Sequence, residues 1–293
     1  MTDARSEVIA EGLSFGEGPR WHDGQLSVSD MWNNRVVTVD GDGAVTTVVE
    51  AGDRVSGLGW DQAGRLHIVA MSQRALLRLE PDGSLRPIAL LEGVGNGWAN
   101  DMLIDANDHA FVGSFGEPNN DGIPQPTALA MVDLASGAVT EAASDLQFAN
   151  GMVVAPDGAQ LVVAETRGAR LTAFDLAQDG ALTNRRQVAD LDYASPDGIC
   201  LDEAGSIWVA TPSYRPPDGT THPRNECFLV DRAGQITARI ATEHRTYACM
   251  LGGSDGRTLY ICTSPTSGEE RAAGNGVAYI EAARVDIPHA GLP

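Results

Sequence analysis

Four side chains with oxygen ligands stand at matching places in the sequence, each nine to eleven residues before an apolar run that follows a tight turn. They are Glu17, Asn100, Asn150 and Asp197. Carboxylate and amide oxygens are hard ligands, and two negative charges with room for water favour calcium, at about 2.3–2.6 Å. If the fold brings the four together, we expect one divalent cation, calcium preferred, with zinc, magnesium or manganese as the other candidates.

The same counting identifies one residue in each of six segments, and the six positions read Glu17, Ser56, Asn100, Asn150, Asp197 and Ala248. Two carboxylates and two amides buried together without compensation would destabilise the protein, and a bound cation removes that penalty. The alternative is a water-filled polar channel in which these Asn and Asp residues only cap the starts of strands.

Other catalytic patterns are missing from the sequence. The six histidines show no HxH, HxxH or HExxH spacing, no GxSxG motif occurs, and the chain has no lysine, which excludes Schiff-base chemistry and a phosphate-loop lysine. The four cysteines lack CxxC spacing, so we expect buried structural thiols. The ring of oxygen ligands is therefore the strongest candidate site.

These residues need an element that repeats six times. An apolar run, a turn such as Asp61-Gln62-Ala63-Gly64 and a second apolar run recur along the chain, with the second runs 40 to 52 residues apart. These runs begin at Leu26, Leu66, Ala110, Leu161, Ile207 and Leu259. Short alternating strands in units of this length are typical of propeller blades. The sequence predicts an all-β fold, a six-bladed β-propeller with four antiparallel strands per blade, as a single domain over residues 1–293.

The two ends of the chain predict how the ring closes. The last unit runs out after the strand at 276–280, while the apolar stretch 7–10 precedes the first blade without a partner. Because propellers avoid free sheet edges by closing the ring, we expect the N-terminal strand to complete the sixth blade.

The amino-acid composition limits the kinds of partner that the protein is expected to bind. With 40 acidic residues against 20 arginines the formal charge is −20, which repels nucleic acid and anionic membranes. No apolar stretch approaches the ~20 residues of a membrane helix, and the first residues lack a secretory signal. We expect a cytoplasmic protein that binds a small molecule, with no nucleic acid and no membrane as partner. The oligomeric state is not indicated.

Four motifs in order resemble the regucalcin/gluconolactonase family of six-bladed propellers, also described as SMP-30/gluconolactonase/LRE-like. They are Phe15-Gly16-Glu17-Gly18-Pro19-Arg20-Trp21, Asn100-Asp101-Met102, Asn150-Gly151-Met152 and Pro196-Asp197-Gly198. The resemblance covers essentially the whole chain. It implies that Glu17, Asn150 and Asp197 bind the metal and that Asn100 is either a fourth ligand or a contact to the metal-bound water and substrate.

The sequence departs from sugar-lactone members of that family at one position. Those proteins have an arginine two residues before the equivalent of Asn100, and Trp98 stands there in this chain. An indole offers an apolar face and one donor in place of a forked cation. A partly apolar lactone or ester is therefore favoured over a free sugar.

Three long loops are expected to overhang the site as ordered or hinged covers rather than extra strands, at 115–126, 212–226 and 264–275. The residues expected in the wall are aromatic, histidine or cysteine side chains. They are Trp32, Trp98, Phe115, Tyr214, His222 and Cys249. Of these, Trp98, Phe115, Tyr214 and His222, together with Asn100, are the predicted substrate-binding residues.

The predicted function is metal-dependent hydrolysis of a lactone or ester. The cation would polarise the carbonyl, and Asp197 would act as the base or the nucleophile. Two other functions remain open: a non-catalytic propeller that binds a partner and uses its cation structurally, and a different metal-assisted reaction at the same site, such as isomerisation or organophosphate hydrolysis.

Overall fold

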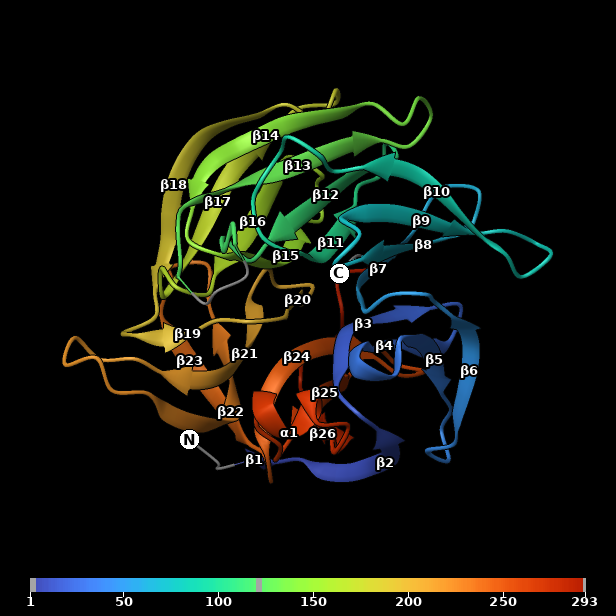
Figure 1. Ribbon diagram of the computed structural model, residues 1–293. Coiled ribbons are helices and arrows are strands. Elements are labelled where there is room, and N and C mark those ends of the chain that lie inside the picture. Colours follow the sequence, from blue (N-terminus) through green and yellow to red (C-terminus); the bar gives the residue numbers. More distant parts are fainter. Residues whose placement is uncertain (1–3, 120–122, 292–293) are drawn as a thin grey trace.

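The computed structural model describes residues 4–119 and 123–291, and its strands form six antiparallel sheets arranged in a ring around one axis (Figure 1). This confirms the predicted six-bladed β-propeller. Successive strands of each blade are neighbours in its sheet, so that each blade is a meander running from the axis to the outside. Most of these connections are short, and the longer ones follow β12, β21 and β25. Within the part of the chain that the structure describes, helix is confined to two short segments, η1 (Met31–Asn33) and α1 (Gly268–Ala272).

The first three blades follow one another without interruption, each running from its innermost to its outermost strand. Blade 1 consists of β3 (Gly16–His22), β4 (Gln25–Asp30), β5 (Arg35–Val39) and β6 (Val45–Glu50). Blade 2 consists of β7 (Val55–Trp60), β8 (Leu66–Ala70), β9 (Ala75–Leu79) and β10 (Leu85–Leu90). Blade 3 consists of β11 (Ala99–Ile104), β12 (His109–Ser114), β13 (Thr127–Asp133) and β14 (Val139–Leu146).

The last three blades include two departures from the simple pattern. Blade 4 consists of β15 (Ala149–Val154), β16 (Gln160–Glu165), β17 (Arg170–Leu176) and β18 (Leu182–Asp190). Blade 5 has a split innermost strand, β19 (Ala194–Ser195) and β20 (Ile199–Leu201), then β21 (Ile207–Tyr214), β22 (His222–Val230) and β23 (Ile236–Ala241). Blade 6 consists of β24 (Arg245–Gly252), β25 (Thr258–Ser264), β26 (Ala278–Arg284) and the N-terminal β2 (Glu7–Leu13).

The N-terminal strand closes the ring, as predicted. Strand β2 pairs antiparallel with β26, from Glu7 opposite Ala282 to Leu13 opposite Ala278, so that blue and red segments lie side by side in Figure 1. Ahead of it, β1 (Ala4–Arg5) pairs parallel with β23 at the outer edge of blade 5. Because the two chain ends share a blade, the ring opens only when that pairing breaks.

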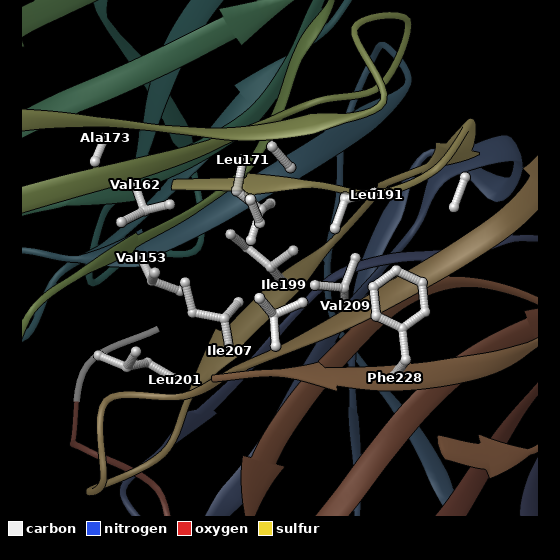
Figure 2. Packing of buried hydrophobic residues seen from close by; sticks show 14 residues of the cluster. Val153, Val162, Leu171, Ala173, Leu191, Ile199, Leu201, Ile207, Val209 and Phe228 are labelled. Carbon is white, nitrogen blue, oxygen red and sulfur yellow. The ribbon is translucent and has the colours of Figure 1, made fainter. Parts of the chain in front are cut away.

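Apolar layers between neighbouring blades hold the ring together. Figure 2 shows one of them, where Val153, Val162 and Leu171 of blade 4 face side chains of blade 5. Their partners Ile199, Val209 and Phe228 are at most 2% exposed. Strands buried on both faces in this way explain the apolar runs seen in the sequence. The four cysteines are also buried and free, as expected.

Within the described residues, no helix has the length and apolar character needed to cross a membrane.

Ring closure by β2 gives the first prediction. A chain that begins at Ser14 loses the burial of Ala10 and Leu13 and exposes the edge of β26, so we expect a loss of several kcal/mol and aggregation. Thermal unfolding and light scattering measure both effects. The matched control begins at Ser6 and loses only β1, and it should melt within a few degrees of the full chain. Equal stability of the two truncations would contradict the role given to β2.

Candidate metal centre and its cavity

The six ring positions lie where the innermost strands lose their regular pairing. Pairing with the second strand is interrupted between Glu17 and Arg20, between Val55 and Leu58, and at the corresponding points of β11, β15 and β24. In blade 5 the interruption separates β19 from β20, and Asp197 lies in the gap. An irregularity of this kind redirects a side chain that would otherwise point along the sheet normal. The repeat therefore aims one side chain per blade at the axis.

Glycines that follow the ring residues let neighbouring blades approach at this level. A Cβ atom on Gly18 of blade 1 would lie 2.6 Å from Ser56 O of blade 2, and one on Gly151 of blade 4 would lie 2.6 Å from Asp197 O of blade 5. A Cβ on Gly198 would lie 2.5 Å from the Cβ of Ala248 in blade 6. The Glu-Gly, Asn-Gly and Asp-Gly pairs of the sequence are thus required by backbone contact, in addition to any role of the first residue.

Glu17, Asn100, Asn150 and Asp197 line one cavity of about 250 Å³ at the end of the channel where the innermost strands begin. All four are buried, between 3% and 8% exposed. The two other ring residues, Ser56 and Ala248, are buried but do not line it. The structure therefore brings together the four oxygen donors that the sequence pointed to, from four different blades.

Hydrogen bonds fix the orientation of the Asn150 amide. The Thr166 hydroxyl donates to Pro196 O at 2.7 Å, so its oxygen accepts the 3.1 Å bond from Asn150 Nδ2. The same Nδ2 donates to Asp197 Oδ1 at 2.5 Å. With its nitrogen engaged on this side, the amide presents Oδ1 as its remaining polar atom, which is the atom that a hard cation binds.

The Glu17 carboxylate has little to stabilise its charge. Among the described residues, its one hydrogen bond comes from the Gly18 N–H at a distance of 3.3 Å. Burial raises the pKa of Glu17 well above its usual range, and the charges of Asp197 and Asp101 raise it further. Burial likewise raises the pKa of Asp197, to about 8, although the hydrogen bond from Asn150 acts in the opposite direction. The charge of Arg271 lowers both pKa values and that of Arg215 lowers the pKa of Asp197, but burial is the larger effect, so the surroundings favour the protonated forms of both carboxyls.

An ion pair that sequence reasoning did not identify lies deeper in the channel. Arg20, three residues beyond Glu17 on β3, donates to Asp101 Oδ1 at 2.9 Å, and both side chains are 5% exposed. Asp101 occupies the place that glycine takes after the other donors, and it also accepts from the Met102 N–H at 2.8 Å. The pair joins blades 1 and 3. The signal was the Asn-Asp step in a series otherwise followed by glycine.

The donor set fits a hard divalent cation. It offers two carboxylates whose negative charge is unbalanced and two amides, one with its oxygen left over after its nitrogen is engaged. Among residues 4–119 and 123–291, no group of three or more His, Cys, Asp or Glu side chains could hold a metal ion. A cation in this cavity would therefore depend on the amide oxygens as well as the carboxylates.

Aromatic and thioether side chains form the wall of the cavity above the donors. The wall contains Phe15, Met31, Trp32, Met71, Trp98, Phe115, Phe148 and Tyr247. Trp32, Trp98 and Phe115 were expected there, and the structure places all three in the wall. The cavity thus combines the four oxygen donors with a largely aromatic wall.

A single arginine shapes the loop that carries Trp98. The guanidinium of Arg74 donates to the carbonyl oxygens of Leu91, Val94, Gly95 and Gly97, at 2.5 to 3.2 Å. The glycine-rich stretch 93–97, which misses the spacing of a dinucleotide loop, wraps around this side chain. Its glycines at 93, 95 and 97 have positive φ angles, which is why the loop needs them.

Phe115 is held from the neighbouring blade. Arg167 Nη1 donates to Phe115 O at 2.5 Å, and Arg167 Nη2 forms an ion pair with Glu117. The guanidinium carbon of Arg167 lies 5.0 Å from the centre of the Phe148 ring. The loop expected at 115–126 starts here, and its residues 120–122 lie outside the described part of the chain.

Tyr214 and His222 were predicted to bind substrate, but neither lines this cavity. The segment 212–226 is also less of a loop than predicted, because β21 and β22 continue into it and Tyr214 pairs with His222 at the end of their ladder. Pro212, Ser213 and Arg215 of this segment do line the cavity, while the Tyr214 ring lies against the His222 ring instead. Cys249 is also outside the wall, packed between blades 5 and 6. The loop at 264–275 contains helix α1, which begins with a capping box at Ser267.

Sequence reasoning missed all three of the basic lining residues, Arg54, Arg215 and Arg271. Arg54 precedes strand β7, Arg215 follows β21, and Arg271 belongs to α1. None of them stands in a motif, and they lie in three different kinds of segment, so no shared sequence signal marked them.

A family model for the SMP-30/Gluconolactonase/LRE-like region matches residues 15–265. The 6-deoxy-6-sulfogluconolactonase of Pseudomonas putida is 26% identical, over 100% of this chain and 99% of the relative. Regucalcin of Gallus gallus is 22% identical, over 92% and 90%. The pentonolactonase XacC of Haloferax volcanii is 25% identical, over 98% and 96%.

Solved structures share the fold. A gluconolactonase from Xanthomonas campestris superposes with a TM-score of 0.76 at 23% identity, covering 98% of this chain and 91% of the other. A calcium-binding protein described as regucalcin, from Agrobacterium tumefaciens, gives 0.76 at 20% identity, covering 98% and 97%. A luciferin-regenerating enzyme gives 0.79 at 17% identity, covering 97% of both chains.

Close packing at the ring gives the second prediction. Gly198→Ala forces a methyl group against Ala248, so we expect a loss of about 1–3 kcal/mol in the free energy of unfolding. Gly41→Ala is the matched control, because nothing lies within 4 Å of its Cβ position, and it should change stability by less than ~0.5 kcal/mol. Urea unfolding measures both. Equal stability of the two variants would show that the blades can separate here without cost.

Proposed function

The chain belongs to the SMP-30/gluconolactonase/LRE-like family, and we propose that it is a metal-dependent lactonase, a hydrolase that opens a small, partly apolar lactone or ester at a divalent cation in the central channel. The observation that carries the proposal is that Glu17, Asn100, Asn150 and Asp197 line one cavity whose wall is aromatic. Relatives named as lactonases, one covered over nearly its whole length, support the reaction class.

Glu17, Asn150 and Asp197 would hold the cation, with Asn100 as a fourth ligand or a contact to water and substrate. A hard cation bound there supplies Lewis-acid polarisation of the substrate carbonyl oxygen. Calcium is the preferred ion because oxygen ligands in an irregular arrangement suit its flexible coordination. One structural neighbour is described as a calcium-binding protein.

Asp197 would move the proton. Its Oδ1 is held by the Asn150 amide, which leaves Oδ2 to accept a proton from the attacking water, or to attack the carbonyl itself. In the first route the water oxygen bonds to the carbonyl carbon, the ring C–O bond breaks, and the proton returns to the departing oxygen. The product is a hydroxy acid. Thr166, anchored on Pro196 O, keeps the Asn150–Asp197 pair in place.

The volume and the aromatic wall of the cavity limit the size and polarity of the substrate. A cavity of about 250 Å³ lies at the lower end of the usual range for small-molecule sites, so it fits one small ring with short substituents. Trp98 and Phe115 offer apolar surface, with ring centres 6.4 Å apart in an edge-to-face arrangement. A small lactone with an apolar face matches both features.

Substitution of the proposed base gives the third prediction. Asp197→Asn removes the proton acceptor while nearly preserving shape, so kcat on the best lactone of a panel should fall at least ~100-fold. Asp179→Asn, in an exposed turn of blade 4, is the matched control and should keep the wild-type rate. A pH-stat assay measures release of acid. Full turnover by Asp197→Asn would remove this residue from the mechanism, and inertness towards lactones, esters and organophosphates would favour a binding propeller.

Removal of the metal gives the fourth prediction. Calorimetric titration of the chelator-treated protein with calcium should show one site per chain, and Glu17→Gln should weaken binding at least ~10-fold by removing one of two anionic ligands. Hydrolysis should stop with chelator and return with calcium. Glu203→Gln is a matched control on an exposed turn. Binding that is equal in wild type and Glu17→Gln would place the ion elsewhere.

A further inference from the structure

Three guanidinium groups line the cavity without a carboxylate partner. Arg54, Arg215 and Arg271 all contribute to its lining, and none of them takes part in an ion pair among residues 4–119 and 123–291. The chain has twice as many acidic residues as arginines, so a shortage of partners does not explain this. The cavity combines three positive side chains with the two carboxylates of the ring.

Arg54 is held by two indoles. Its guanidinium carbon lies 3.7 Å above the centre of the Trp32 ring and 4.7 Å from that of Trp98. Contacts of this kind use the flat face of the guanidinium, whereas its five N–H donors lie in its plane. Among the hydrogen bonds of the described residues, its side chain makes none, so the donor edge remains available to a ligand.

The nearest carboxylate is engaged with the backbone and with a hydroxyl group. Asp53 accepts from the Arg54 N–H at 2.8 Å and the Ser72 hydroxyl at 2.5 Å through Oδ1, and from the Gln73 N–H at 2.9 Å through Oδ2. It is 9% exposed. The loop therefore places an acid next to Arg54 without pairing the two charges. Partial burial lowers the pKa of Arg54, but the group stays charged at neutral pH.

The other two arginines come from other blades, and one of them, Arg215, comes from the blade opposite Arg54. Arg54 belongs to blade 2, Arg215 to blade 5 and Arg271 to the loop of blade 6, and in a six-membered ring blades 2 and 5 face each other across the axis. Arg271 lies 4.1 Å from the centre of the Phe15 ring and donates to Thr266 O at 2.6 Å, while its buried Nε has no partner. Positive charge thus borders the cavity on two sides.

This arrangement fits a substrate with a negative charge away from the reacting carbonyl. Once the two ring carboxylates are balanced by a divalent cation, the three guanidinium groups remain unbalanced. A neutral ligand would leave the charge of the three guanidinium groups unbalanced, whereas an anionic ligand would balance it in a site partly shielded from water. A carboxylate is the anion that best matches the forked donors of one arginine, and it adds little volume in a cavity this small.

We propose that the substrate is a small lactone that bears a carboxylate, and that Arg54, placed by Trp32 and Trp98, is the specificity-determining residue that binds this group. That the substrate is a lactone rests on the proposed hydrolase function. That the site binds a carboxylate rests on Arg54 and does not depend on that function. The Trp98 ring, which the sequence suggested as apolar surface for the substrate, is in contact with the Arg54 guanidinium. The cavity therefore contains a forked cation next to Trp98, and this cation comes from the neighbouring blade.

Binding of two ring compounds that cannot be hydrolysed tests the proposal. Tetrahydrofuroate carries the carboxylate and tetrahydrofurfuryl alcohol is its neutral counterpart of nearly the same size. Calorimetric titration, done with and without added calcium to separate binding at a metal ion, should show that the carboxylate binds the wild-type protein at least tenfold more tightly. Equal affinity for the two compounds would overturn the proposal.

Variants assign the effect to one side chain. Arg54→Gln should weaken tetrahydrofuroate binding by about tenfold to hundredfold, as expected for loss of charge-assisted hydrogen bonds, and leave the alcohol unchanged. Arg54→Lys, which keeps the charge but not the fork, should fall between. Arg86→Gln removes an exposed arginine from the outer strand of the same blade and should match wild type. Thermal unfolding verifies that each variant is folded. Wild-type affinity in Arg54→Gln would overturn the proposal.

Kinetics separate this inference from the proposed function. If butyrolactone and its ring carboxylate are both tested, kcat/KM should favour the carboxylate in wild type and lose that preference in Arg54→Gln. If neither lactone is hydrolysed while tetrahydrofuroate binding still depends on Arg54, the hydrolase function fails and the anion site stands. If butyrolactone is hydrolysed equally well by both proteins and its carboxylate is not preferred, the function stands and the anion site is wrong.

Discussion

Two carboxylates, Glu17 and Asp197, are held at one end of a buried channel where neither has a basic side chain hydrogen-bonded to it. Burial and mutual repulsion both favour their protonated forms, so holding both carboxyls in the charged form would lower the stability of the folded protein. The one buried arginine nearby, Arg20, is engaged by Asp101. The positive charge of Arg271 lowers the pKa of both carboxyls and that of Arg215 lowers the pKa of Asp197, but burial outweighs both effects, so a cation bound between the carboxylates would stabilise their charged forms. The Asn150 amide is consistent with a bound cation, because its nitrogen is engaged and its oxygen is left over, and aromatic side chains line the same cavity.

The scaffold supports this arrangement through repetition. Each blade interrupts the pairing of its innermost strand at the same point, which aims one residue at the axis, and a glycine after most of these residues lets the next blade approach. Two features keep the blades close enough for these contacts. One is the apolar packing between blades, such as that of Val153, Ile199 and Phe228, and the other is closure of the ring through β2. Chemistry at the axis therefore depends on packing far from it.

Much of this could be predicted from the sequence because the turns are regular. Counting back from the strand that follows each blade's first tight turn reached all four donors, since strand length varies little between a blade's turn and the axis. Prediction failed where it depended on loop conformation. Tyr214 and His222 were placed in the wall because 212–226 was expected to be a loop over the site, yet β21 and β22 continue into it and pair these two residues with each other outside the lining. Arg54 was missed because its position matters only through Trp32 and Trp98, which come from two other segments of the chain.

The central claim is that oxygens of Glu17, Asn100, Asn150 and Asp197 surround one hard cation. The most direct test is a crystal structure grown with calcium, with anomalous differences collected at a long wavelength where calcium scatters. The account predicts a single strong peak on the propeller axis, about 2.3–2.6 Å from side-chain oxygens of at least Glu17, Asn150 and Asp197. A map with no peak there, or with a guanidinium group seated between the two carboxylates, would contradict it.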